Sequence, residues 1–164
     1  MTGPRVRDLL ERKGDPLQLE ALTGDVGLDR LITTPEASSP GLVLAGYTKR
    51  FAAHRIHILG ETEITYLDSL GAAERRKALE TFFQFDLPCV VISKGQEPPP
   101  ELLDLARAKG VPVIAFLGKG GGELAKLVDQ ALIIASSETS HIQEIHLALE
   151  HLIVELVEEE LCGR

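Results

Sequence analysis

The sequence contains few of the residue types that mark specialised folds. It has no Trp and only 4% aromatic residues, so its core must be packed mainly from aliphatic side chains. Its two cysteines, Cys89 and Cys162, are too few for a disulfide framework, and Cys89 lies in an apolar run where a free thiol behaves as a small hydrophobic side chain. No segment approaches the roughly 20 apolar residues of a membrane-spanning helix, and the N-terminus lacks the apolar stretch of a signal peptide. We therefore expect a cytoplasmic protein without a membrane partner.

Positive charge is also scarce. Lys and Arg number 17 against 25 Asp and Glu, which gives a net charge of −8 and a pI near 5.1. A nucleic-acid partner would need a local basic patch to overcome this overall repulsion. The densest basic stretch, residues 74–77, is accompanied by Glu80 and has no aromatic side chains beside it on which bases could stack. It is typical of the solvated face of a helix, so no nucleic-acid partner is expected.

The pattern that the chain does contain is that of a packed α/β domain. Its 164 residues, 44% hydrophobic, are enough to form a single core. From residue 88 onward, near-continuous apolar strands alternate with helices, which is typical of a parallel sheet covered on both faces. The sequence predicts a three-layer α/β fold with a mainly parallel sheet, helices on both faces and a long C-terminal helix.

The element boundaries follow from turn residues and hydrophobic periodicity. Gly14, Asp15 and Pro16 are expected to stop the first helix. The expected helices begin at residue 6 and span residues 61–70, 72–85, 100–109, 122–129 and 139–162, with a helical turn at 40–46. The expected strands span residues 17–21, 31–33, 55–60, 88–93, 111–117 and 131–135.

Five ordered blocks of the first two thirds carry a family resemblance. They lie at residues 6–11, 27–32, 40–47, 55–64 and 98–103. Together they resemble the N-terminal domain of HPr kinase/phosphorylase over about residues 4–113. The resemblance implies a parallel α/β accessory domain, because that family places its activity in a following kinase domain with a P-loop, and this sequence contains no G-x-x-x-x-G-K-[ST]. Ser39 stands where the family has an Arg, which weakens any ligand role for that turn.

The last third is similar to a different family. Residues 110–114, 121–127 and 136–146, together with His151 and Glu155, resemble the C-terminal part of SIS-type sugar isomerases, closest to phosphoheptose isomerase. The resemblance covers about residues 100–160. It implies that Gln143 and His151 face an active site and can hold zinc, and that Thr139 and Ser136 can contact a sugar phosphate. The first half of that site, with its other ligands and phosphate-binding serines, is missing here.

The candidate site residues have simpler interpretations as well. The glycine-rich stretch 118–122, with Gly120 and Gly121 at its centre, could cradle a phosphate, but its spacing favours a flexible turn. Thr139 is explained as the N-cap of the last helix. Histidines five residues apart in that helix do not point the same way, and Gln143 with His151 gives only two ligands, which argues against a functional zinc site and predicts no cofactor. His54 and His57 are interpreted as surface or edge residues without a nucleophile beside them.

These observations favour a non-enzymatic α/β scaffold. We interpret the chain as a single domain formed by fusion of an HPr-kinase-like segment (1–105) and an SIS-like segment (106–164), as an engineered or naturally recombined chimera without catalytic activity. The alternatives are a phosphosugar- or anion-binding protein related to sedoheptulose 7-phosphate isomerase, or a stand-alone regulatory domain of the HPr kinase family. The last helix is expected to mediate homo-oligomerisation through its apolar stripe, which comprises Ile142, Ile145, Leu149, Leu152 and Leu156.

Overall fold

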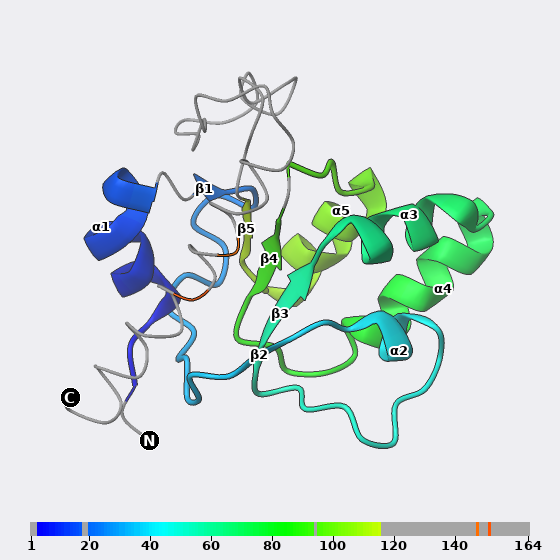
Figure 1. Cartoon of the computed structure of the whole chain (residues 1–164), viewed down its shortest axis with the longest axis horizontal. Coiled ribbons are helices and arrows are strands. Elements are labelled where there is room, and N and C mark those ends of the chain that lie inside the picture. The colour runs from blue at the N-terminus through cyan, green and yellow to red at the C-terminus, as the bar shows by residue number, and fades with distance from the viewer. Residues whose placement is uncertain (1–2, 18–19, 94, 116–146, 148–150, 152–164) are drawn as a thin grey trace.

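The computed structural model describes residues 3–17, 20–93 and 95–115, together with Leu147 and His151. Its centre is a five-stranded sheet with the strand order β1-β5-β4-β3-β2 (Figure 1). Strands β2 to β5 pair in parallel, and β1 pairs antiparallel with β5 at one edge. The strands are β1 (Glu20–Ala21), β2 (Ala37–Ser38), β3 (Ile56–Leu59), β4 (Val90–Ile92) and β5 (Val113–Ala115).

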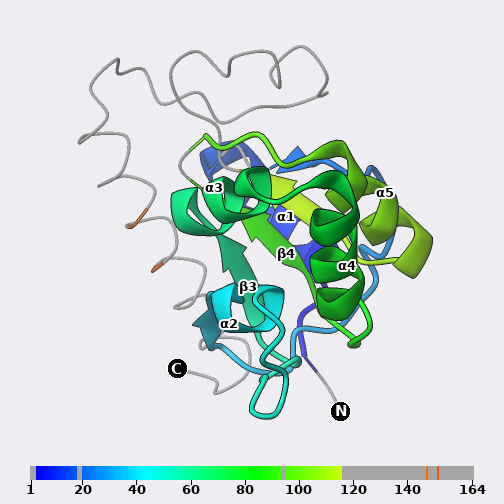
Figure 2. The same ribbon diagram turned by 90° about the vertical axis from the view of Figure 1, so that its right-hand side faces the viewer.

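Helices cover both faces of this sheet. One face carries α1 (Val6–Leu17), and the other carries α2 (Gly41–Leu44), α3 (Glu61–Ser69), α4 (Ala72–Phe82) and α5 (Pro100–Lys109), as Figures 1 and 2 show. This arrangement confirms the predicted three-layer α/β fold with a mainly parallel sheet.

Successive side chains along each strand point to opposite faces of the sheet, and each face packs into its own core cluster. On β4, Val90 and Ile92 belong to the first core cluster, which lies under α2 to α5 and includes the fully buried Leu79 of α4. Cys89 and Val91 point the other way, into the second core cluster under α1. A strand that is buried on both sides needs an unbroken apolar sequence, which explains the run at residues 87–92.

Several predicted boundaries agree with the structure and others do not. Helix α5 begins and ends as predicted, with Pro100 at its first position and Gly110 at its C-terminal cap in the left-handed region (φ 63°). The predicted stop of the first helix is wrong, since α1 continues through Gly14 and Pro16 to Leu17. Glycine makes a helix costlier by about 1 kcal/mol without forbidding it.

The other differences are local. Helix α4 ends at Phe82 rather than residue 85, because the chain turns there and inserts Phe83 and Leu87 into the first core cluster. Leu31 forms an isolated bridge with Arg5 instead of a strand. The predicted elements at 122–129 and 131–135 lie outside the described residues, and of the predicted last helix only Leu147 and His151 are described, both helical. Among the described helices, none combines the length and apolarity needed to cross a membrane.

Candidate functional site at the carboxyl edge of the sheet

Polar residues gather where β2, β3 and β4 end. Ser38 and Ser39 lie at the end of β2, Gly60 follows β3, and Ser93 follows β4. Parallel strands end at the same edge of a sheet, and this is the edge where open α/β sheets bind ligands. The backbone N–H of Ser93 donates to the carbonyl of Leu59 at 3.0 Å, which places Ser93 beside Gly60. We call Ser38, Ser39, Gly60, Glu63 and Ser93 the carboxyl-edge cluster.

Glu63 is the charged residue of the carboxyl-edge cluster. Only 7% of its surface is exposed, although it lies in the first turn of α3. One carboxylate oxygen accepts a hydrogen bond from the backbone N–H of Gly60 at 3.0 Å, and the other accepts from the Ser39 hydroxyl. Glu63 therefore caps α3 and at the same time fastens the turn that enters α2.

His57 of β3 lies next to the carboxyl-edge cluster and is completely buried. Its ring stacks on Phe51 at 4.6 Å between centroids and meets Phe82 edge-on at 5.6 Å. The pKa of His57 is lowered to about 4, mainly by burial and to a smaller extent by the charges of His54 and Arg55. Its Nε2 has no hydrogen-bond partner among the described residues. The expectation that His57 is a surface or edge residue is therefore wrong: β3 is an inner strand, and aromatic side chains cover the ring.

The proximity of Ser38 to His57 does not make a nucleophile and base. The Ser38 hydroxyl lies 3.4 Å from Nδ1, and none of the described carboxylates orients the ring from its other nitrogen. An imidazole with a pKa near 4 is also a weak base at neutral pH. In the second serine pair, Ser39 donates directly to Glu63, with no imidazole between them. The described part of this edge can form hydrogen bonds but shows no positioned base for nucleophilic chemistry.

The charge at the start of α3 also bears on ligand choice. Glu61 and Glu63 both lie in its first turn. Carboxylates at that position already stabilise the positive end of the helix dipole, and they repel a phosphate. The first turn of α3 is thus a poor site for a phosphorylated ligand.

A cavity lies at the opposite edge of the sheet. Its volume is about 390 Å³, and it is lined by Arg30, Leu31, Thr33, His54, Asp86, Leu87 and Pro88. That volume would suit a small molecule. However, the Arg30 guanidinium already donates to the carbonyls of Leu87 (2.9 Å), Lys109 (3.2 Å) and Gly110 and pairs with Asp86. Arg30 therefore serves to join distant loops rather than to bind an anion.

The site residues predicted from the sequence fall mostly outside the described residues: Gly120, Gly121, Ser136, Thr139 and Gln143. His151 is described and lies exposed on a helix. Within the described ranges, no group of three potential ligands could hold a metal ion. His54 is exposed, as expected. Sequence reasoning gave no role to Glu63, although an acidic residue three positions after a glycine that ends a strand is a signal for a capping residue.

Most of the chain matches the sequence model of one protein family. Residues 5–118 match the family model described as HPr Serine kinase N terminus. The HPr kinase/phosphorylase of Bacillus mycoides (strain KBAB4) is 34% identical over 110 residues, which are 67% of this chain and 34% of that protein. The HPr kinase/phosphorylase of Halalkalibacterium halodurans is 39% identical over 107 residues, 65% of this chain and 33% of that protein. The chain thus spans about a third of the length of the curated relatives it matches.

Similarity to solved structures is weaker. One similar structure is the crystal structure of the CBS and DRTGG domains of the regulatory region of Clostridium perfringens pyrophosphatase, complexed with the activator diadenosine tetraphosphate. The superposition covers 87% of this chain and 60% of the pyrophosphatase chain. Its TM-score is 0.45 at 12% sequence identity.

Proposed function

Because this chain belongs to the family of HPr serine kinase N-terminal domains, we propose that it is a regulatory domain without catalytic activity of its own. The observation that carries this proposal is the extent of the match. The chain corresponds to about a third of HPr kinase/phosphorylase, and the sequence contains no P-loop of the kind used for phosphoryl transfer.

The described residues support the same proposal. In the carboxyl-edge cluster the Glu63 carboxylate accepts hydrogen bonds from the Ser39 hydroxyl and the Gly60 N–H, and the imidazole of the adjacent buried His57, with its pKa lowered to about 4, is neutral at neutral pH. These contacts stabilise the fold, and within the described part of this edge they leave no acid and base positioned on either side of a substrate.

Neither the family match nor the similar proteins support the resemblance to phosphoheptose isomerase or the fusion of two segments. The family match continues through residue 118, past the junction expected near residue 105, so the segment 106–118 needs no second parent to explain it. A regulatory domain therefore replaces the chimeric scaffold as the favoured function.

Two experiments test the proposal. Purified chain incubated with HPr and ATP should yield no phosphorylated HPr, as measured by mass spectrometry. Residues 5–118 should then replace the matching segment of the Bacillus mycoides enzyme, with a truncated enzyme lacking that segment as the control. We expect the hybrid to phosphorylate HPr with a response to ATP and phosphate concentration different from that of the truncated enzyme. Phosphorylation by the chain alone would disprove the absence of catalysis, and identical behaviour of the hybrid and truncated enzymes would disprove the regulatory role.

A further inference from the structure

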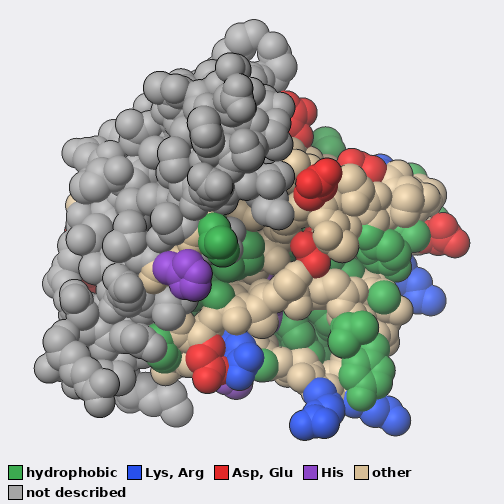
Figure 3. All heavy atoms as spheres, viewed as in Figure 1, with side chains coloured by type: hydrophobic (Ala, Val, Ile, Leu, Met, Phe, Trp, Pro, Cys, Tyr) green, Lys and Arg blue, Asp and Glu red, His purple; other side chains and the backbone are tan. Residues whose placement is uncertain are grey.

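An apolar and basic surface lies over α2 and the connection from α2 to β3. Leu42 is 70% exposed and Tyr47 is 49% exposed, which makes them two of the few large apolar side chains that the described residues present to solvent. Lys49 and Arg50 follow directly and are also exposed. Figure 3 shows hydrophobic side chains beside Lys and Arg side chains on this part of the molecule. We call Leu42, Tyr47, Lys49 and Arg50 the α2 surface.

The backbone holds the two apolar residues of the α2 surface in place. Helix α2 ends in a Schellman motif: the N–H of Tyr47 donates to the carbonyl of Leu42 at 2.9 Å, and the N–H of Gly46 donates to that of Val43 at 3.0 Å. Gly46 adopts the positive φ of 94° that this motif requires. The motif fixes the backbone of Leu42 beside that of Tyr47, although neither side chain is buried, so the backbone of the pair is already in place before any partner binds.

The other end of the connection is also anchored. Phe51 stacks on His57 and contacts Phe82 and Phe85, so its ring joins the first core cluster directly after the two cations. The backbone N–H of Phe51 donates a hydrogen bond to the backbone carbonyl of Thr48 at 3.2 Å. This bond closes the turn that carries Lys49 and Arg50. A surface ordered in this way loses little conformational entropy on binding.

Among the arginines whose side chains the structure describes, Arg50 of the α2 surface differs from the rest in having no carboxylate partner there. The other arginines with described side chains, namely Arg5, Arg7, Arg30, Arg55, Arg75, Arg76 and Arg107, each lie within 4.0 Å of a carboxylate. Arg50 and Lys49 have no such partner among the described residues. In a chain of net charge −8, two adjacent unpaired cations beside an exposed apolar pair favour an acidic and apolar partner.

We propose that the α2 surface binds residues 155–161 of a second copy of this chain. That segment reads Glu-Leu-Val-Glu-Glu-Glu-Leu, so it supplies both the carboxylates and the apolar side chains that the surface lacks. The described residues nearest to it in the sequence, Leu147 and His151, are both exposed. Each copy carries both the surface and the segment, so two copies can make the same contact reciprocally.

The net charge of the molecule favours a short acidic segment over an extended polyanion as the partner of the α2 surface. A nucleic acid or an anionic membrane meets the field of the whole molecule, which repels it. A short peptide segment meets mainly the exposed charges closest to it, which on the α2 surface are those of Lys49 and Arg50, because charges beyond a Debye length of about 8 Å are screened. The same argument predicts that the contact weakens as salt is added.

Sedimentation velocity of the full chain across the micromolar range tests the proposal. The wild-type protein should associate, and Lys49→Glu with Arg50→Glu should weaken association by about tenfold or more. Lys77→Glu with Lys109→Glu is the matched control, since both lysines are exposed, lack a described carboxylate partner and give the same change in net charge. Leu42→Ser should also weaken association without lowering the melting temperature, because Leu42 is largely exposed.

A charge swap identifies the partner segment. Glu158→Lys with Glu159→Lys should weaken association as well, and combining these changes with Lys49→Glu and Arg50→Glu in one chain should restore it. A wild-type protein that remains monomeric, an equal effect of the matched control, or failure of the combined variant to recover would each overturn the proposal. So would binding to phosphatidylserine vesicles or DNA that depends on Lys49 and Arg50 while self-association does not.

Discussion

At the residue scale, two glycines of one loop face different constraints. Gly24 and Gly27 both have positive φ, 63° and 73°. A Cβ at Gly24 would meet nothing within 4 Å, whereas one at Gly27 would lie 2.3 Å from the Gly110 carbonyl oxygen and 2.8 Å from Pro112. We expect Gly24→Ala to cost about 1 kcal/mol, the backbone term alone. Gly27→Ala should cost more than about 2 kcal/mol, because a backbone contact must also shift. Urea unfolding measures both, and equal losses would show that the contact with Gly110 can relax freely.

His57 gives the molecule a pH-dependent stability. Because its pKa is lowered from 6.5 to about 4, the unfolded chain binds a proton below pH 6.5 that the folded chain does not accept until about pH 4. The free energy of unfolding should therefore fall as pH drops through this window, by up to about 3 kcal/mol. Above pH 6.5 the contribution is constant.

Substitution separates this effect from the titration of carboxylates. His57→Phe should flatten the dependence of the free energy of unfolding on pH between about 5 and 6.5, whereas His54→Gln should change it much less, because His54 is exposed and its charge is a minor cause of the lowered pKa of His57. Urea unfolding at several pH values checks both. The same slope in wild-type and His57→Phe proteins would mean that His57 titrates normally.

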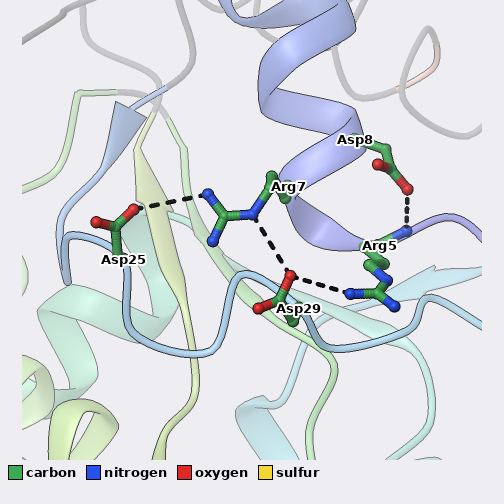
Figure 4. Close-up of polar contacts among 5 residues, drawn as sticks. All are labelled: Arg5, Arg7, Asp8, Asp25 and Asp29. Atoms are coloured by element: carbon green, nitrogen blue, oxygen red, sulfur yellow. Dashed lines mark hydrogen bonds and ion pairs between the residues drawn. The ribbon is translucent and has the colours of Figure 1, made fainter.

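At the element scale, α1 is attached to the loop 22–31 by charge as well as by its buried Val6 and Leu9. Figure 4 shows Arg5 and Arg7 converging on Asp29, at 3.2 and 3.4 Å, and Asp8 accepting from the backbone N–H of Arg5. Hydrogen bonds from Arg5 and Arg7 lower the pKa of Asp29, so this attachment is lost only when pH falls below the ordinary range of an aspartate.

Asp29→Asn should therefore loosen α1. We expect faster amide hydrogen exchange in α1, measured by mass spectrometry, with little change in α4. The difference from wild type should shrink in about 1 M salt, where the screening length is about 3 Å. Asp104→Asn is the control, because the described partner of Asp104 is Arg107, which lies in the same helix α5. Exchange in α1 that does not respond to Asp29→Asn would leave Val6 and Leu9 as its sufficient anchors.

Elements with strong local signals were predictable from the sequence, and contacts between distant residues were not. Pro100 and Gly110 mark the ends of α5, and the apolar run of β4 identifies a buried strand. By contrast, no local pattern shows that Arg30 reaches carbonyls 57 to 80 residues away, or that Phe51 covers His57. The carboxyl-edge cluster could be anticipated only in part, since serines after strands predict polar groups at one edge but not that Glu63 joins Ser39 to Gly60.

At the scale of the whole molecule, the two core clusters share a single sheet. Leu79 is fully buried in the first core cluster, and Cys89 is fully buried in the second, on the opposite face. If the described residues unfold as one domain, damage to one face must expose the other. Burial raises the pKa of the Cys89 thiol to about 12, so this thiol reacts only when the structure opens.

Cys89 labelling thus tests whether the two faces unfold together. In a Cys162→Ser background, Leu79→Ala should lower the free energy of unfolding by about 2–5 kcal/mol because it leaves a cavity in the first core cluster. Cys89 should then be labelled faster by a disulfide reagent near pH 8. The labelling rate should increase about tenfold for each 1.4 kcal/mol by which the free energy of unfolding falls. Leu42→Ala is the control, since the side chain removed there is 70% exposed and both quantities should hardly change. If Leu79→Ala lowered the thermal midpoint while Cys89 labelling stayed slow, the two faces of the sheet would unfold separately. Destabilising the face that contains Leu79 can expose Cys89 on the opposite face only if both faces unfold in one cooperative transition.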